Sequence, residues 1–290
     1  MAQSMSQEQA DERSADGVDT GVSPARSLRA RVPGQHAIGE FLRAHSAEQP
    51  RSIWARLFGV SPIGSESEPF FAGALGELRV GELLSQLDRD WTVLHAVPVG
   101  PEGTDLDHLL IGPAGVFTIT TRNHPGVAIA VSGRSVLVDG MKRAHIRATE
   151  HDLGRAERRL TAALGEPVTV TGLLVFVEPL SLTLRGTPKD VEVLASGELL
   201  AWLEAQPAVF DAVEVQRVAT VAELPSTWGS AQQMDDDSGV VELDRLLRLV
   251  ERSRVLRQLW FGTATILIIV SATALATLAI LGAIPGSAAH

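Results

Sequence analysis

The stretch DLDHLLIGPAGVFTITTRN, residues 105–123, decides the fold. Two mainly apolar runs, 106–111 and 116–121, flank the sequence Gly-Pro-Ala-Gly at 112–115. Glycine and proline between two strand-like runs are typical of a tight connection, so this stretch predicts a β-hairpin.

The pairing register follows from the turn. If Ile111 pairs with Val116, counting along the antiparallel strands brings a set of polar side chains to one face, because alternate residues of a strand point to the same side. The set consists of Asp105, Asp107, Thr118, Thr120 and Arg122, with Asp107 opposite Thr120 and Asp105 opposite Arg122. The other face carries Leu106, Leu110, Phe117 and Ile119 and is predicted to be buried.

The hairpin and its surroundings resemble the nuclease-related domain (NERD) family over roughly residues 71–230. The segments that carry the resemblance are Gly76–Glu82, Trp91–His95, Asp105–His108, Ile111–Phe117 and Asn123–Gly126. The family is placed in the PD-(D/E)xK, restriction-endonuclease-like fold. The resemblance therefore implies an α/β domain with a mixed sheet flanked by helices.

The resemblance also implies an active site. In that fold an Asp on one strand and a Glu-x-Lys on the next hold Mg²⁺ and activate water. Asp107 stands at the Asp position, Thr120 stands where the Glu is expected, and Arg122 stands where the Lys is expected. Glu77 matches a candidate active-site acid of the family, so the implied Mg²⁺ ligands are Asp107 and Glu77; an ordinary solvated helix residue is the alternative for Glu77.

Thr120 and Arg122 differ from the Glu and Lys of the family pattern, and these two differences leave two hypotheses open. Mg²⁺ prefers anionic oxygen ligands, and the Thr120 hydroxyl is neutral. The Arg122 guanidinium can hold a phosphate but cannot lose its proton as a lysine can. The domain is either a degenerate nuclease domain that binds nucleic acid or another partner, or an active Mg²⁺-dependent phosphodiesterase on DNA or RNA. A surface ion pair between Arg122 and Asp105 is a third, purely structural interpretation.

Three more side chains are candidates for binding substrate phosphates. His124 follows the hairpin, and Arg147 and Arg155 lie on a helix predicted over residues 145–164. A turn histidine without a role and a solvated basic helix face are the alternatives. Another helix is predicted over Ala74–Leu87, and the remaining predicted strands and helices are 91–97, 127–131, 135–138, 168–177, 191–195, 197–206 and 212–222.

Charge counts against nucleic-acid binding, although acidic nucleases that act through a metal are known. Residues 71–230 contain 20 acidic and 13 basic side chains, a net charge near −7. Phosphate binding usually needs a basic stripe. The chain has no cysteine, which excludes disulfides and thiolate metal sites.

The sequence before the domain divides into two parts. Residues 1–35 are predicted to be disordered and lack the pattern of a secretory signal. Residues 36–70 are predicted to form short amphipathic helices. There Trp54, Leu57 and Phe58 either contact a membrane surface or pack on the domain.

The sequence after the domain predicts a membrane anchor. Residues 231–258 are a polar linker and an amphipathic helix, 259–284 are 26 residues without a charge, and 285–290 are a short tail. About 20 apolar residues span a bilayer as a helix. Arginines before this segment predict a single-pass protein of the cell membrane with its domain in the cytoplasm. Ala272 and Ala276 form a small-xxx-small pair that predicts weak self-association of the anchor.

Overall fold

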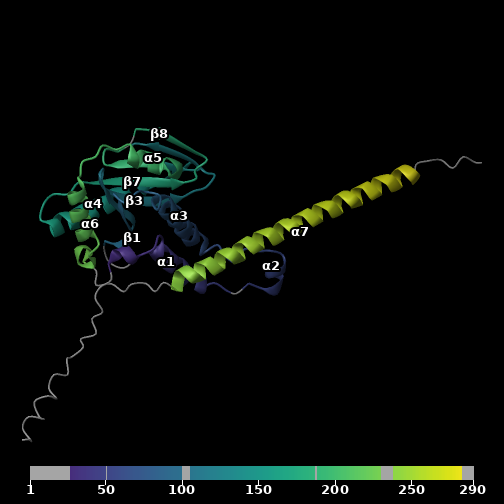
Figure 1. The fold of residues 1–290 in the computed structure, drawn as a ribbon. Coiled ribbons are helices and arrows are strands. Elements are labelled where there is room, and N and C mark those ends of the chain that lie inside the picture. The colour runs from purple at the N-terminus through teal and green to yellow at the C-terminus, as the bar shows by residue number, and fades with distance from the viewer. Residues whose placement is uncertain (1–26, 50, 100–104, 187, 230–237, 283–290) are drawn as a thin grey trace, which may run out of the picture.

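The computed structural model describes residues 27–49, 51–99, 105–186, 188–229 and 238–282. These residues form a mixed α/β domain from which one long helix, α7 (Ser238–Gly282), runs outward (Figure 1). The predicted class, a mixed sheet flanked by helices with one C-terminal apolar helix, is confirmed.

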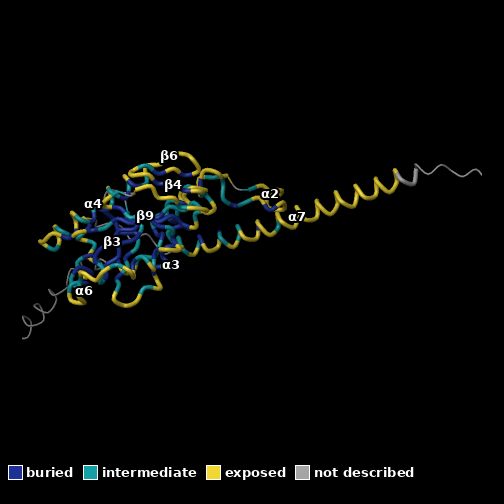
Figure 2. The backbone as a smooth tube through the Cα atoms, turned by 90° about the horizontal axis from the view of Figure 1, so that it is seen from above, coloured by how far each residue is buried: buried dark blue, intermediate teal, exposed yellow. Residues whose placement is uncertain are grey.

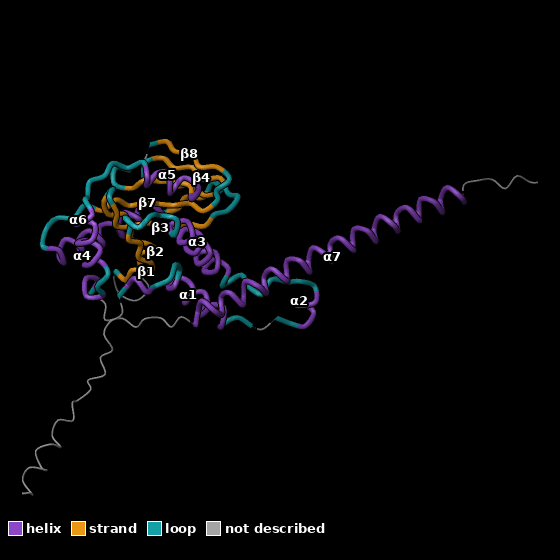
Figure 3. Tube along the Cα trace, in the orientation of Figure 1, coloured by secondary structure: helices purple, strands orange, loops and turns teal. Residues whose placement is uncertain are grey.

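The hairpin forms the centre of a five-stranded mixed sheet in the order β1-β2-β3-β7-β9 (Figure 3). The strands are β1 (Thr92–Pro98), β2 (Asp105–Gly112), β3 (Gly115–Asn123), β7 (Val170–Val177) and β9 (Val191–Ala195). Ile111 pairs with Val116 as predicted. Strands β1, β2 and β3 are antiparallel neighbours, whereas β7 runs parallel to β3 and β9.

A second, four-stranded sheet lies beside the first, where the sequence predicts only a hairpin. Its order is β6-β5-β4-β8, with β4 (Ala128–Ser132), β5 (Ser135–Val138), β6 (Met141–Arg143) and β8 (Ser181–Arg185). The predicted hairpin is β4–β5. Strands β6 and β8 were not predicted because they are short and mostly exposed, so neither carries a core-like alternation of apolar residues.

Helices cover both faces of the five-stranded sheet, whose strands are the most deeply buried part of the chain (Figure 2). Helices α3 (Glu68–Leu84) and α5 (Leu199–Glu204) pack on the face of Leu110 and Phe117. Helices α4 (His145–Leu164) and α6 (Ala212–Ala222) pack on the face of Leu109, Ile111 and Val116. The polar face of the hairpin is therefore only partly covered, because Thr118 and Thr120 are buried whereas Asp105, Asp107 and Arg122 are half-buried.

Helix α3 begins six residues before its predicted start, because Pro69 fits the first turn of a helix and Glu68 favours its positive end. It also lies close to β3. A side-chain carbon at Gly76 would lie 2.8 Å from the Asn123 Cβ, and the Asn123 amide donates a 2.7 Å hydrogen bond to the Ala72 carbonyl. This close approach sets Glu77 beside the end of the sheet.

The predicted N-terminal disorder does not extend to residues 27–35. Leu28, in the short helix η1 (Leu28–Ala30), is buried, and its N–H donates to the Glu223 carbonyl. This segment contains few large apolar residues, but the burial of Leu28 is enough to hold it against the domain. Residues 1–26 lie outside the described residues. Helices α1 (Gln35–Ser46) and α2 (Ile53–Leu57) are the predicted short amphipathic helices.

The amphipathic segment and the apolar span predicted at the C-terminus are one continuous helix, α7. Near its start Leu243 and Leu246 are buried against Ile38 and Phe41 of α1. Its apolar part runs out from the domain and is exposed to residue 279, as expected of a membrane-spanning helix. The part of the predicted linker up to residue 237 and the predicted tail at 285–290 lie outside the described residues.

Candidate functional site

Two carboxylic acids, Glu77 and Asp152, lie near Asp107, where β2 and β3 separate. His108–Ile119 is the last residue pair of their ladder on that side. The next residue, Asp107, turns its Oδ2 to accept a 2.6 Å hydrogen bond from the Thr121 N–H. Glu77 approaches from α3 on one face of the sheet and Asp152 from α4 on the other. We call Glu77, Asp107 and Asp152 the acidic cluster.

Burial makes these acids reluctant to ionise, and repulsion from other carboxylates adds to this effect at Glu77 and Asp107. Burial and then the Asp107 charge raise the pKa of Glu77 well above its usual value. Burial raises the pKa of Asp107 to about 6, against the lowering effects of Arg122 and the Thr121 N–H. Burial also raises the pKa of Asp152. Glu77 and Asp107 still retain some solvent-accessible surface.

Arg122 supplies the positive charge of the site. Its guanidinium donates from Nε to His145 Nδ1 at 3.2 Å and from Nη1 to the Thr121 carbonyl at 2.6 Å. Its charge also lowers the pKa of all three members of the acidic cluster. Arg122 is therefore a fixed counter-ion among the acids.

The ion pair proposed between Arg122 and Asp105 does not form. Asp105 instead binds Arg31, which precedes α1, with a Nη1–Oδ2 distance of 3.1 Å. Both side chains are largely buried, with 8% and 15% of their surface exposed. Arg31 Nη1 also donates to the Ala96 carbonyl. The interpretation as a surface ion pair between Arg122 and Asp105 is wrong, because Arg31, from the segment predicted to be disordered, pairs with the Asp105 carboxylate.

The other predicted site residues differ in their burial and in their contacts with this centre. Thr120 is buried, with 4% of its surface exposed. His124 is half-buried, its ring 5.7 Å from that of His145. Arg155 lowers the pKa of Asp152 and so lies at the margin of the acidic cluster. Arg147 is exposed on α4, and no contact places it in the site.

Two residues that sequence reasoning missed, Asp152 and His145, share one helix face. Together with the buried Thr149 they follow the spacing of four and three residues that sets side chains above one another on a helix. This spacing is readable in the sequence. A stripe read from apolar residues alone does not reveal it, because His145, Thr149 and Asp152 are polar.

His145 has an unused hydrogen-bond donor. Its Nδ1 accepts from Arg122, so the proton of the neutral ring must lie on Nε2. Burial, with Arg122, His124 and Arg143 nearby, lowers the pKa of His145 to about 4, and the ring is neutral at pH 7. Its buried Nε2 finds no hydrogen-bond partner in the part of the chain that the structure describes, and neither does Nε2 of His124.

The residues present fit a catalytic Mg²⁺ poorly. Within the described ranges, no three His, Cys, Asp or Glu side chains are placed to hold a metal ion. Thr120, at the position of the missing Glu, is enclosed. Arg122 already brings positive charge to Glu77 and Asp107, the two predicted ligands. The described residues therefore do not support a metal-dependent step.

Comparison with known proteins agrees with the resemblance. Residues 72–177 match the family described as the nuclease-related domain, NERD. This region of the chain is therefore similar to a NERD domain. The matched NERD residues include Glu77, Asp107, Arg122, His145 and Asp152.

One related protein gives no further indication of activity. It is an uncharacterized protein of Bacillus anthracis, 36% identical over 76 residues, which are 25% of this chain and 36% of the relative. The chain thus spans little more than a third of the length of this curated relative. No solved structure matches the chain.

Proposed function

We propose that the NERD domain is a degenerate nuclease domain that binds nucleic acid through its phosphates and does not cleave it. The observation that carries this proposal is the pair formed by Arg122 and His145. The first is a permanent cation, and the second has a buried Nε2–H without an acceptor among the described residues, which a phosphate can reach once the side chains that cover it move. A phosphate oxygen satisfies both a positive charge and a hydrogen-bond donor.

Local charge supports phosphate binding in an otherwise acidic domain. Arg122 and the exposed Arg143 both lower the pKa of His124 and His145, so two cations lie near this pair of rings. The net charge of the domain opposes nucleic acid at long range, and we expect weak, salt-sensitive binding.

The same geometry opposes hydrolysis. Arg122 cannot give up its proton and so cannot replace a catalytic lysine as a base. The enclosed Thr120 offers no anionic oxygen. An active Mg²⁺-dependent phosphodiesterase remains the alternative function, favoured by the raised pKa values of Glu77 and Asp107, since acids with such pKa values are suited to proton transfer.

We further propose that α7 anchors the domain to the cell membrane in a single pass, with the domain in the cytoplasm. Arg252, Arg254 and Arg257 precede the apolar part of α7, and basic residues favour the cytoplasmic side. Ala272 and Ala276 provide a small face for weak pairing of two anchors.

The test uses the full chain in lipid nanodiscs with labelled DNA and RNA oligonucleotides. We expect binding that weakens with salt and is reduced by Arg143→Gln or His145→Phe, but not by the control Arg185→Gln on β8. With Mg²⁺ or Mn²⁺, any cleavage should equal the background of Asp107→Asn. Cleavage that needs the metal and Asp107 would establish the alternative function. Absence of binding would overturn the nucleic-acid proposal.

A second experiment restores the family pattern at Thr120 and Arg122, the two positions that differ from it. The double variant Thr120→Glu with Arg122→Lys restores the expected residue types at both positions. If the scaffold is a degenerate nuclease, this variant should gain metal-dependent cleavage over the parent chain, whereas no gain would show that the surroundings of the site have also changed.

A further inference from the structure

An apolar patch lies beside the helix that leaves the domain. It consists of Ile53, Trp54, Leu57, Phe58 and Trp260, which we call the interfacial patch. Ile53 is 81% exposed and Trp54 68% exposed. Of the two interpretations of this segment, packing on the domain fails, because these side chains face away from it.

The interfacial patch is fixed to α7. The indole N–H of Trp260 donates to the Leu57 carbonyl at 2.9 Å, and the rings of Phe58 and Trp260 are 5.1 Å apart. The following turn is pressed onto the same helix, since a side-chain carbon at Gly59 would lie 2.5 Å from the Ser253 carbonyl oxygen. Helix α2 therefore has a defined position along α7.

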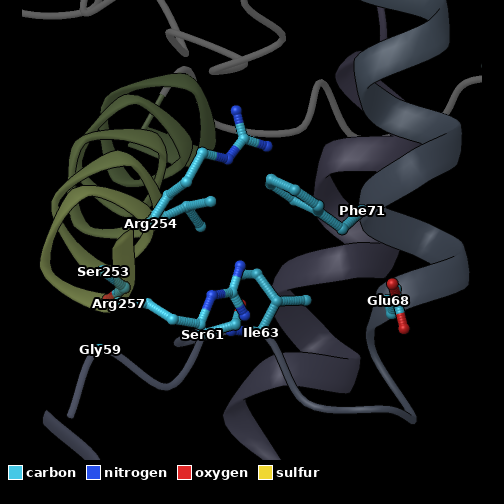
Figure 4. Close-up of a pocket in the computed structure, with 9 residues that line it drawn as sticks. Gly59, Ser61, Ile63, Glu68, Phe71, Ser253, Arg254 and Arg257 are labelled. Carbon is cyan, nitrogen blue, oxygen red and sulfur yellow. The ribbon is translucent and has the colours of Figure 1, made fainter. Parts of the chain in front are cut away.

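A cavity of about 340 Å³ opens next to this contact, between α7 and the segment that leads into α3 (Figure 4). Arg254 and Arg257 extend into it from α7, and Phe71 faces them from α3 (Figure 4). Ser61 and Ser253 add hydroxyl groups to its lining, and Glu68 is its one acidic residue. The cavity thus combines arginines, hydroxyl groups and an apolar ring.

The positive charge of this region is mostly uncompensated. Within the part of the chain that the structure describes, no acidic side chain pairs with Arg257, Arg51 or Arg56. Arg254 has one loose partner, Glu251, at 3.7 Å. Arg51 lies against the cavity wall, its guanidinium 3.3 Å from the Ser253 hydroxyl. The cavity therefore favours an anion.

Helix geometry sets the depth of the cavity relative to a bilayer. At about 1.5 Å per residue, Trp260 to Gly282 spans about 33 Å, close to the ~30 Å hydrocarbon layer. Tryptophan prefers the interface, and Trp260 stands at one end of this span. Arg257 and Arg254 then lie about 4.5 and 9 Å outside the hydrocarbon, at the level of lipid headgroups.

We propose that this cavity binds the phosphate of an anionic phospholipid through Arg254 and Arg257, while the interfacial patch inserts α2 into the membrane interface. The ligand is a lipid because the arginines and the patch occupy neighbouring depths of one bilayer leaflet. A headgroup phosphate reaches the arginines, and its acyl chains lie where Trp54 and Phe58 are exposed.

Lipid selectivity is tested on the full chain in micelles containing equal amounts of phosphatidylglycerol and phosphatidylcholine, with bound lipid counted by native mass spectrometry. We expect selective retention of phosphatidylglycerol. Arg254→Gln with Arg257→Gln should weaken it on the order of tenfold, because each basic residue near a membrane attracts anionic lipid. The matched control, Arg245→Gln with Arg248→Gln, removes the same charge farther from the apolar span and should change little.

Equal retention by both double variants, with equal melting temperatures, would overturn the proposal. Displacement of the lipid by inorganic phosphate alone would assign the cavity to free anions instead.

Insertion of α2 is tested separately in vesicles. Because the chain has no cysteine, Ile53→Cys gives one labelling site for an environment-sensitive dye. Its fluorescence should be quenched by lipid-borne quenchers, while the control Val213→Cys, on α6 and 77% exposed, should not be. Equal quenching at the two sites would refute insertion. Both experiments rest on the proposed membrane anchor, but neither involves nucleic acid, so each is independent of the proposed nucleic-acid binding.

Discussion

Replacing Asp107 by asparagine should stabilise the protein at alkaline pH. Asparagine has the shape of the protonated acid, and its amide oxygen can still accept the hydrogen bond from the Thr121 N–H. It removes a charge that burial disfavours, and also the repulsion that Asp107 exerts on Glu77. The substitution would therefore raise the stability of the fold by replacing a disfavoured charge with a neutral side chain of the same shape.

The size and sign follow from the pKa of Asp107. Folding raises this pKa from 3.8 to about 6. The folded state therefore binds more protons than the unfolded state between these values, and stability falls as pH rises through this window. At about 1.4 kcal/mol per pKa unit the loss is about 3 kcal/mol. Asp107→Asn should recover an amount of this order at pH 8 and almost none at pH 4.

The assay is denaturant unfolding of the full chain in detergent, followed by tryptophan fluorescence at pH 4, 6 and 8. Asp190→Asn, at an exposed position, serves as the control and should follow the wild type at every pH. If Asp107→Asn and the wild type have the same free energy of unfolding at pH 8, or a difference that does not depend on pH, the description of Asp107 as a strained buried acid is refuted.

Three further changes test neighbouring parts of the structure. Arg122→Ala leaves the acidic cluster without its counter-ion and should cost on the order of 3 kcal/mol at pH 8, less at pH 5, in the same unfolding assay; a cost independent of pH would contradict this. Gly76→Ala forces α3 away from Asn123 and should cost about 1–3 kcal/mol, with Gly73→Ala, where space is open, as control. Leu243→Ala should cost about 2–5 kcal/mol and make the start of α7 accessible to protease, whereas unchanged proteolysis would argue against its docking on α1.

The hairpin shows how far local pattern determines structure. Turn residues and alternation fixed the pairing of Ile111 with Val116, because a slip by one residue would move every side chain to the wrong face. The helix at 145–164 and the strand at 191–195 were likewise predicted with their observed bounds. The exposed strands β6 and β8 are stabilised by pairing with neighbouring strands, which leaves little trace in their own residues.

The candidate site was only partly readable because its residues come from separate segments. Asp107 and Arg122 share a hairpin, so counting brought them together. Asp152 and Arg31 join through the packing of α4 and of the N-terminal segment, contacts that no local spacing determines. The enclosure of Thr120 depends equally on the helix that covers it. Sequence alone therefore identified the polar groups of two strands but not their partners.

Because α7 is one unbroken helix, the number of its residues sets the rotation of the domain about the helix axis relative to the apolar segment. Each residue inserted between Leu246 and Trp260 would turn the apolar segment by about 100° and lengthen the spacer by about 1.5 Å. If two anchors associate, the two domains that they carry are held at fixed angles around the axis of the helix pair. Helical phase, more than linker length, would then decide which sides of neighbouring domains meet.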